Sequence, residues 1–90
     1  MAITLTIYTT TDCATYDTTR RIAAAVRVQF CRLRVNLVHL DRTPERIPPE
    51  VIATPTYLLN DRVVSLGNPD DEDLYARIRL ALADDAKERA

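Results

Sequence analysis

Residues 53–67 read ATPTYLLNDRVVSLG, and two short apolar runs in this stretch flank Asn60 and Asp61. Asn and Asp tolerate the positive φ angles of a tight turn between strands. The stretch therefore predicts an antiparallel hairpin, which Gly67 ends.

The residues after the hairpin predict a helix. Asn68 is expected to be its N-cap, and Pro69 suits the first helical position. The acidic run at 70–73 suits the positive end of the helix dipole. The apolar positions that recur at helical spacing are Leu74, Ile78, Ala81 and Leu82.

The chain upstream predicts a strand, a helix and a second strand. Residues 2–9, AITLTIYT, alternate between apolar and polar side chains, as in a strand with one buried face. Asp12 or Thr11 can cap the helix that follows, which runs to about Phe30. Residues 33–40, LRVNLVHL, predict the second strand, so the order indicates a right-handed parallel βαβ unit. The apolar stripe of the helix consists of Ile22, Ala25, Val26 and Phe30.

The segment between these two halves, residues 41–55, reads DRTPERIPPEVIATP. Its prolines leave room for little more than one helical turn, because proline removes a donor and clashes with the preceding turn. The sequence thus predicts an α/β fold in βαβ-ββα order, with a four-stranded mixed sheet, two main helices and a reduced middle helix. Both main helices can cover the face that carries Ile3, Leu5 and Ile7, which leaves the opposite face thinly covered.

Length and charge limit the classes of protein to consider. A chain of 90 residues predicts one small domain over residues 1–90, with a core at about 2–83 and a frayed tail at 84–90. The net charge of −1 gives no electrostatic reason to expect nucleic acid or a membrane as a partner. The first residues lack the basic run and cleavage pattern of a signal peptide. We therefore expect a cytoplasmic protein with reduced thiols.

Cys13 and Cys31 flank the predicted first helix at its opposite ends. Such a helix is roughly 24 Å long, whereas a disulfide needs Cα atoms within about 7 Å. The two cysteines are therefore not expected to pair within one chain. A single His39 and the lack of a CxxC motif predict no zinc site, and we place His39 away from the first loop as a structural or exposed residue.

The order of elements and two local motifs together resemble the thioredoxin/glutaredoxin-like family. The first motif, IYTTTDCATY at residues 7–16, is similar to the redox loop of that family, in which a CxxC opens the first helix. The second, ATPT at residues 53–56, is similar to the segment in which a cis-proline precedes the third strand. The resemblance spans Ile3 to Leu82 and implies the thioredoxin-like fold.

The resemblance implies that Cys13 is the nucleophile of a thiol-disulfide oxidoreductase. Tyr16 stands where the resolving cysteine would be, so the chain is a monothiol CxxY variant that needs an outside thiol such as glutathione as co-substrate. A helix N-terminus lowers the pKa of a nearby thiol, whereas the adjacent Asp12 opposes this. No metal or resident cofactor is expected. The alternative is that Cys13 is a small, partly buried residue inherited from a redox ancestor.

The resemblance also implies roles for three further residues. Thr54 and Pro55 would bind the backbone of an extended substrate, with the peptide bond between them in cis. Tyr16 would cover the thiol or donate a hydrogen bond from its hydroxyl. The alternatives are a turn proline at Pro55 and a half-buried amphipathic tyrosine at Tyr16.

The shortened middle segment and ATPT are also similar to the KaiB family, which has a thioredoxin-like order and acts by binding proteins. This resemblance implies a second function, a protein-binding module without redox turnover. The expected partner is a protein or small-molecule thiol or disulfide for the first function. For the second it is a protein or a second copy of the chain, bound through the thinly covered sheet face or through the surface of Cys13, Tyr16 and Pro55.

Overall fold

The computed structural model describes residues 3–12, 14–42, 49, 51 and 53–89. Its elements follow in the order β1 (Thr4–Thr9), α1 (Tyr16–Gln29), β2 (Arg34–His39), β3 (Thr56–Leu59), β4 (Arg62–Leu66) and α2 (Asp71–Arg89). The four strands form one sheet in the order β2-β1-β3-β4. Strand β2 is parallel to β1, and β3 is antiparallel to both β1 and β4. The predicted mixed sheet and its two helices are confirmed, whereas the reduced middle helix falls on residues that lie largely outside the described ranges.

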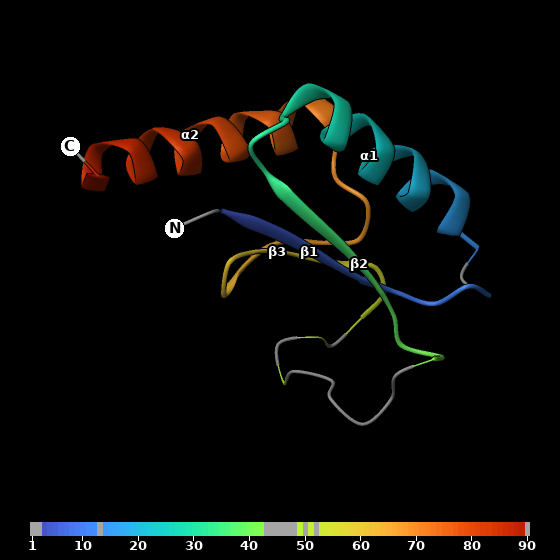
Figure 1. Cartoon of the computed structure of the whole chain (residues 1–90). Helices are drawn as coiled ribbons and strands as arrows, with labels where there is room; N and C mark the ends of the chain where they lie inside the picture. Colours follow the sequence, from blue (N-terminus) through green and yellow to red (C-terminus); the bar gives the residue numbers. More distant parts are fainter. Residues whose placement is uncertain (1–2, 13, 43–48, 50, 52, 90) are drawn as a thin grey trace.

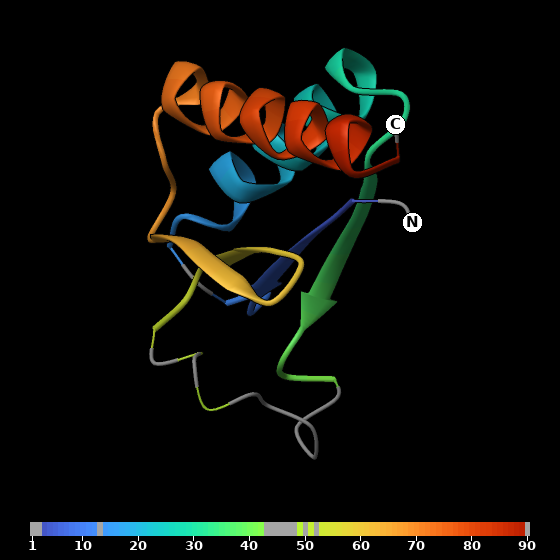
Figure 2. The same ribbon diagram turned by 90° about the vertical axis from the view of Figure 1, so that its left-hand side faces the viewer.

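Both helices pack on the same side of the sheet, as Figures 1 and 2 show from two directions. The alternation in β1 explains this arrangement, because Leu5 and Ile7 are fully buried beneath the helices. The predicted stripe of α1 differs at one position, since Ala23 is buried and Ala25 is only half-buried. The core consists of Ile3, Leu5, Ile7, Ile22, Ala23, Val26, Leu33, Tyr57, Leu59, Leu74 and Ile78.

The opposite face of the sheet is covered unevenly. Thr4, Thr6 and Tyr8 of β1 are half-buried there, as the alternation predicted. Strand pairing places Thr56 opposite Tyr8 and Leu58 opposite Thr6, and both of these β3 side chains are buried. The thinly covered part of this face therefore extends beyond β1. Arg34 and Asn36 of β2 and Leu66 at the end of β4 are exposed there.

Helix α2 begins and ends later than the sequence predicted. It starts at Asp71, and the amide of Leu74 donates to the Asp70 carbonyl at 3.0 Å, so Asp70 takes the place expected for Asn68. The helix continues to Arg89 through the residues expected to form a frayed tail. An ion pair between Arg21 and Asp71, 3.0 Å apart, joins its first turn to α1.

Asn68 does not cap α2 because its side chain is used elsewhere. Its Oδ1 accepts hydrogen bonds from the Thr19 hydroxyl at 2.8 Å and from the Tyr57 hydroxyl at 2.7 Å. Its Nδ2 donates to the Thr15 carbonyl at 3.3 Å. Asn68 therefore links the start of α1, strand β3 and the connection to α2. Burial raises the pKa of Tyr57 to about 12.

In the part of the chain that the structure describes, neither helix is both long and apolar enough to cross a membrane.

Candidate functional site

The predicted site residues share one end of the sheet. Because β1 and β2 are parallel, their C-terminal ends lie together, with Thr9 opposite His39. Strand β3 is antiparallel to β1 and begins at the same end, where Thr56 pairs with Tyr8. The β1–α1 loop, the end of β2 and the Thr54–Pro55 segment therefore leave the sheet at one end.

The start of α1 differs from the prediction. The helix begins at Tyr16 with Thr15 at the N-cap position, and no side chain caps it. Thr11 was expected as a possible cap, but its hydroxyl donates to Asp41 at 2.6 Å and ties the loop to the end of β2. This hydrogen bond lowers the pKa of Asp41, because it favours the charged carboxylate. Asp12, the other expected cap, is exposed.

Cys13 lies outside the described residues. Its neighbours in the chain, Asp12 and Ala14, are both exposed. Since α1 begins only at Tyr16, the helix N-terminus lies farther along the chain than the sequence indicated.

Tyr16 is held by residues that the sequence did not connect to it. Its hydroxyl lies 2.7 Å from Nε2 of His39, and the two ring centroids are 5.6 Å apart. The guanidinium of Arg20 lies 5.9 Å from the centroid of the tyrosine ring. Tyr16 is half-buried, and these contacts fix its ring on the first turn of α1.

The prediction that His39 lies away from the first loop is wrong. The parallel pairing of β1 and β2 brings the last residue of β2 to the start of α1, although 23 positions separate His39 from Tyr16. The βαβ order carried the signal for this contact, because the ends of parallel strands meet at one edge. The same order that predicts the parallel strands also implies that their last side chains lie near the start of α1.

Thr54 and Pro55 are joined by a cis peptide bond, which confirms the prediction. Pro55 is buried and Thr54 half-buried. The Pro55 carbonyl accepts a hydrogen bond from the Gly67 amide at 2.7 Å, and the Thr56 hydroxyl donates to the Ala53 carbonyl. Among the described residues, no hydrogen bond joins Tyr16 to Thr54 or Pro55, so they share an end of the sheet without direct polar contact.

Among the described residues, this end of the sheet offers a few groups for chemistry. It has a phenol hydrogen-bonded to an imidazole, an arginine over the phenol ring and a carboxylate at Asp41. Within the described ranges, no three His, Cys, Asp or Glu side chains gather in a way that could hold a metal ion. Cys31 is a free, exposed thiol beyond the C-terminal end of α1, the opposite end of that helix from Tyr16.

No protein-family model matches the chain, and no curated protein matches its sequence. Solved structures do match. One described as a malarial protein is 16% identical with a TM-score of 0.75, over 88% of this chain and 96% of that one. Oxidized mitochondrial thioredoxin 3 from Saccharomyces cerevisiae is 16% identical with a TM-score of 0.69, over 86% of this chain and 76% of that one. Together with the sheet order β2-β1-β3-β4 and its two helices, these likenesses show that the chain has the thioredoxin-like fold.

Proposed function

We propose that this protein is a monothiol thiol-disulfide oxidoreductase with Cys13 as its nucleophile and glutathione as its co-substrate. One observation carries the proposal. The loop that contains Cys13 and the Thr54–Pro55 segment leave the sheet at the same end. A disulfide substrate bound along Thr54 would thus approach the same end as the thiol.

The proposed reaction has two exchange steps. In the first, the Cys13 thiolate attacks one sulfur of a disulfide, so that a Cys13–substrate disulfide forms and the original sulfur–sulfur bond breaks. The other substrate sulfur leaves as a thiolate and takes up a proton. In the second step, a glutathione thiolate attacks the substrate sulfur of the mixed disulfide, and Cys13 leaves as the thiolate. One substrate sulfur is thus released as a thiol, and the other ends in a disulfide with glutathione. When the substrate is a glutathionylated thiol and Cys13 attacks its glutathione sulfur, the products are the free thiol and glutathione disulfide.

Tyr16 has a positioning role in this proposal. A second cysteine at its position would resolve the mixed disulfide internally, and a tyrosine leaves this step to glutathione. The contacts with His39 and Arg20 hold the tyrosine ring at the start of α1. We propose that the ring shields one side of the loop, so that attack comes from the side of Thr54 and Pro55.

Turnover with a defined substrate tests the proposal. In a Cys31→Ser background, the protein is expected to form a one-to-one glutathione adduct with glutathione disulfide, detected by intact mass. It is also expected to catalyse reduction of a glutathionylated peptide by glutathione. The matched control is Cys13→Ser in the same background, which should do neither. If the two proteins give equal rates, and neither forms the adduct, the proposal fails.

The second candidate function is a binding module without turnover. It is supported by the face of the sheet opposite the helices, where Thr4, Thr6 and Tyr8 of β1 are half-buried and neither α1 nor α2 lies over them. A protein partner bound there would leave the end of the sheet unused. Failure of the adduct and turnover assays, together with a partner that protects Tyr8 from solvent, would favour this function over the first.

A further inference from the structure

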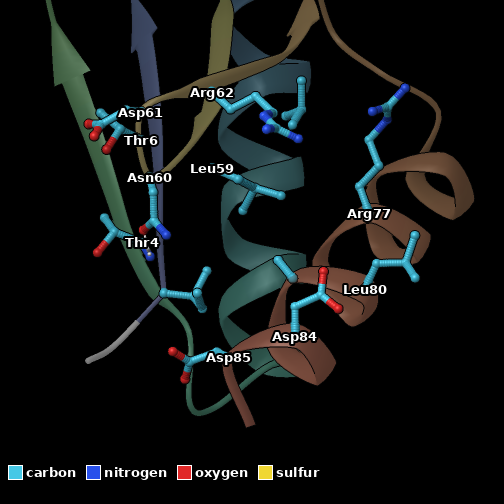
Figure 3. A pocket seen from close by; sticks show the side chains of 13 residues that line it. Thr4, Thr6, Leu59, Asn60, Asp61, Arg62, Arg77, Leu80, Asp84 and Asp85 are labelled. Carbon is cyan, nitrogen blue, oxygen red and sulfur yellow. Dashed lines mark hydrogen bonds between the residues drawn. The ribbon is translucent and has the colours of Figure 1, made fainter. Parts of the chain in front are cut away.

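A groove of about 1110 Å³ lies between α2 and the β3–β4 hairpin. Figure 3 shows it from close by. Ile3 and Thr4 from the start of β1 line it, so it lies at the end of the sheet opposite the Cys13 loop. Its apolar lining includes Leu59, Val64 and Ala81, and Leu80 is 67% exposed beside it.

The charged residues that α2 contributes to the groove are separated by sign. In Figure 3, Arg77 lies toward the end that also carries Arg62 and Asp61 of the hairpin, and Asp84 and Asp85 lie toward the other end. Among the residues that the structure describes, no ion pair joins Arg77 or Asp84 to another side chain. A ligand that fits this groove therefore needs a negative group at one end, an apolar middle and a positive group at the other.

The residues of α2 that line the groove match a second copy of α2 that runs in the opposite direction. Arg77, Leu80, Ala81 and Asp84 follow helical spacing and lie on one face of α2. Arg77 and Asp84 are equally far along the chain from the middle of the Leu80–Ala81 pair. If a second α2 lies antiparallel across this face, each Arg77 meets the Asp84 of the other copy, and each Leu80 meets an Ala81.

We infer that this groove binds α2 of a second copy, so that the protein forms a two-fold symmetric dimer. In such a dimer the same surface serves both partners, which requires the self-complementary pattern that α2 has. The small Ala81 side chain allows two helices to approach to about 8–10 Å. Exposed Leu80 then loses its contact with water, which favours association.

The dimer is expected to be weak and sensitive to salt. The contact face on α2 is short. The two Arg77–Asp84 ion pairs between the copies would lie near the surface, where ions in solution screen them. We expect a dissociation constant on the order of micromolar. The Cys13 loops of both copies stay accessible, because they lie at the opposite end of each sheet. The inference is therefore independent of the proposed function and goes beyond it.

Charge reversal tests the dimer directly. The measurement is sedimentation velocity over a range of concentrations in low salt, in a Cys13→Ser/Cys31→Ser background that excludes disulfide-linked dimers. The parent protein should pass from monomer to dimer as its concentration rises. Arg77→Asp and Asp84→Arg should each weaken the dimer about tenfold or more, because each places like charges together twice. An equimolar mixture of the two variants, and the double variant, should recover the dimer, since both restore opposite charges.

Two controls make the outcome decisive. Arg79→Asp makes the same charge change on α2 outside the groove, and this variant should dimerise like the parent. Recovery in the mixture shows that both single variants are folded. A parent that stays monomeric at about millimolar concentration overturns the inference. So does a dimer that the single reversals leave unchanged, a mixture without recovery, or a dimer lost equally in Arg79→Asp. Leu66 is exposed at the end of β4, on the face of the sheet opposite the helices. A dimer that is lost on Leu66→Asp but not on Arg77→Asp uses that face and equally overturns the inference.

Discussion

Asn68 is the residue on which the packing of α1 against the sheet depends most directly. Its side chain accepts from Thr19 and Tyr57 and donates to Thr15. Thr19 and Tyr57 are fully buried. The Thr19 hydroxyl also lies 3.1 Å from the Thr15 carbonyl, so Tyr57 is the buried hydroxyl that depends on Asn68 most directly. Buried hydroxyls without a partner are costly, and the cost falls on the folded state alone.

Replacing Asn68 by Ala is therefore expected to lower the free energy of unfolding by about 2 kcal/mol or more. Urea unfolding followed by circular dichroism measures this change. Asn36→Ala, at an exposed position of β2, is the matched control and should change the free energy of unfolding by less than about 0.5 kcal/mol. Equal effects of the two variants would show that the Asn68 hydrogen bonds contribute nothing specific.

Tyr57 makes stability depend on pH in the alkaline range. Its folded pKa of about 12 lies above its ordinary value of 10.0, because burial disfavours the charged phenolate. The folded state thus holds the proton more tightly than the unfolded state. The contribution of Tyr57 to the free energy of unfolding is therefore complete below pH 10 and is lost as the pH rises toward 12.

We predict that the free energy of unfolding falls between pH 10 and 12 more steeply in the parent than in Tyr57→Phe. Denaturant titrations at several pH values give both slopes, and the other tyrosines contribute alike to the two proteins. Parallel slopes would mean that the phenol of Tyr57 ionises as easily in the folded state as in the unfolded chain.

At the scale of elements, the β3–β4 hairpin is attached to the first residue of β1 through its turn. Asn60 has a φ of 54° and so lies in the left-handed region, as the sequence predicted for this turn. Its amide donates to the Thr4 carbonyl at 2.8 Å, and its Oδ1 accepts from the Thr4 amide at 3.1 Å. One residue thus supplies both the turn conformation and a side-chain bond to a second strand.

Two variants separate these contributions. Asn60→Gly keeps the positive φ at no steric cost but loses the side-chain bond, and Asn60→Ala loses both. We expect both to be less stable than the parent, with Asn60→Ala less stable than Asn60→Gly by about 1 kcal/mol. Thermal and urea unfolding measure the order. An alanine variant as stable as the glycine variant would contradict the role of the backbone conformation.

For the whole molecule, the two ends of the sheet differ in character. One end carries the Cys13 loop, the Tyr16–His39 pair and Pro55, and the other carries the charged groove beside α2. Figure 1 shows α2 extending along the sheet toward the side where the chain begins. Chemistry at one end and association at the other can therefore coexist in one small domain.

The sequence was sufficient for the strands, their order and the two helices, because periodicity and turn residues are local signals. Local signals also explain the errors. Asn68 is of a residue type that is common at helix N-caps, but its side chain bonds to Thr19 and Tyr57, which belong to other elements. Thr11 is also of a type that is common at N-caps, but its hydroxyl bonds to Asp41, just after the end of β2.

The candidate site was predicted less completely than the fold for a similar reason. The cis bond before Pro55 followed from a motif within the segment itself. The contact of His39 with Tyr16 depends on the register of β1 and β2, which no local pattern in either segment reports. The groove beside α2 depends on how the hairpin and the helix lie relative to each other, and no local pattern indicates that arrangement.

The reactivity of Cys13 is the most direct test of the proposed chemistry. The measurement is the rate of Cys13 alkylation against pH in a Cys31→Ser background, compared with a short unfolded peptide that carries the same loop. We predict that the thiol in the folded protein titrates below the pKa of about 8.5 of a free cysteine and reacts faster near neutral pH than the peptide thiol. A titration that coincides with that of the peptide, or lies above it, would contradict an activated thiol at this position.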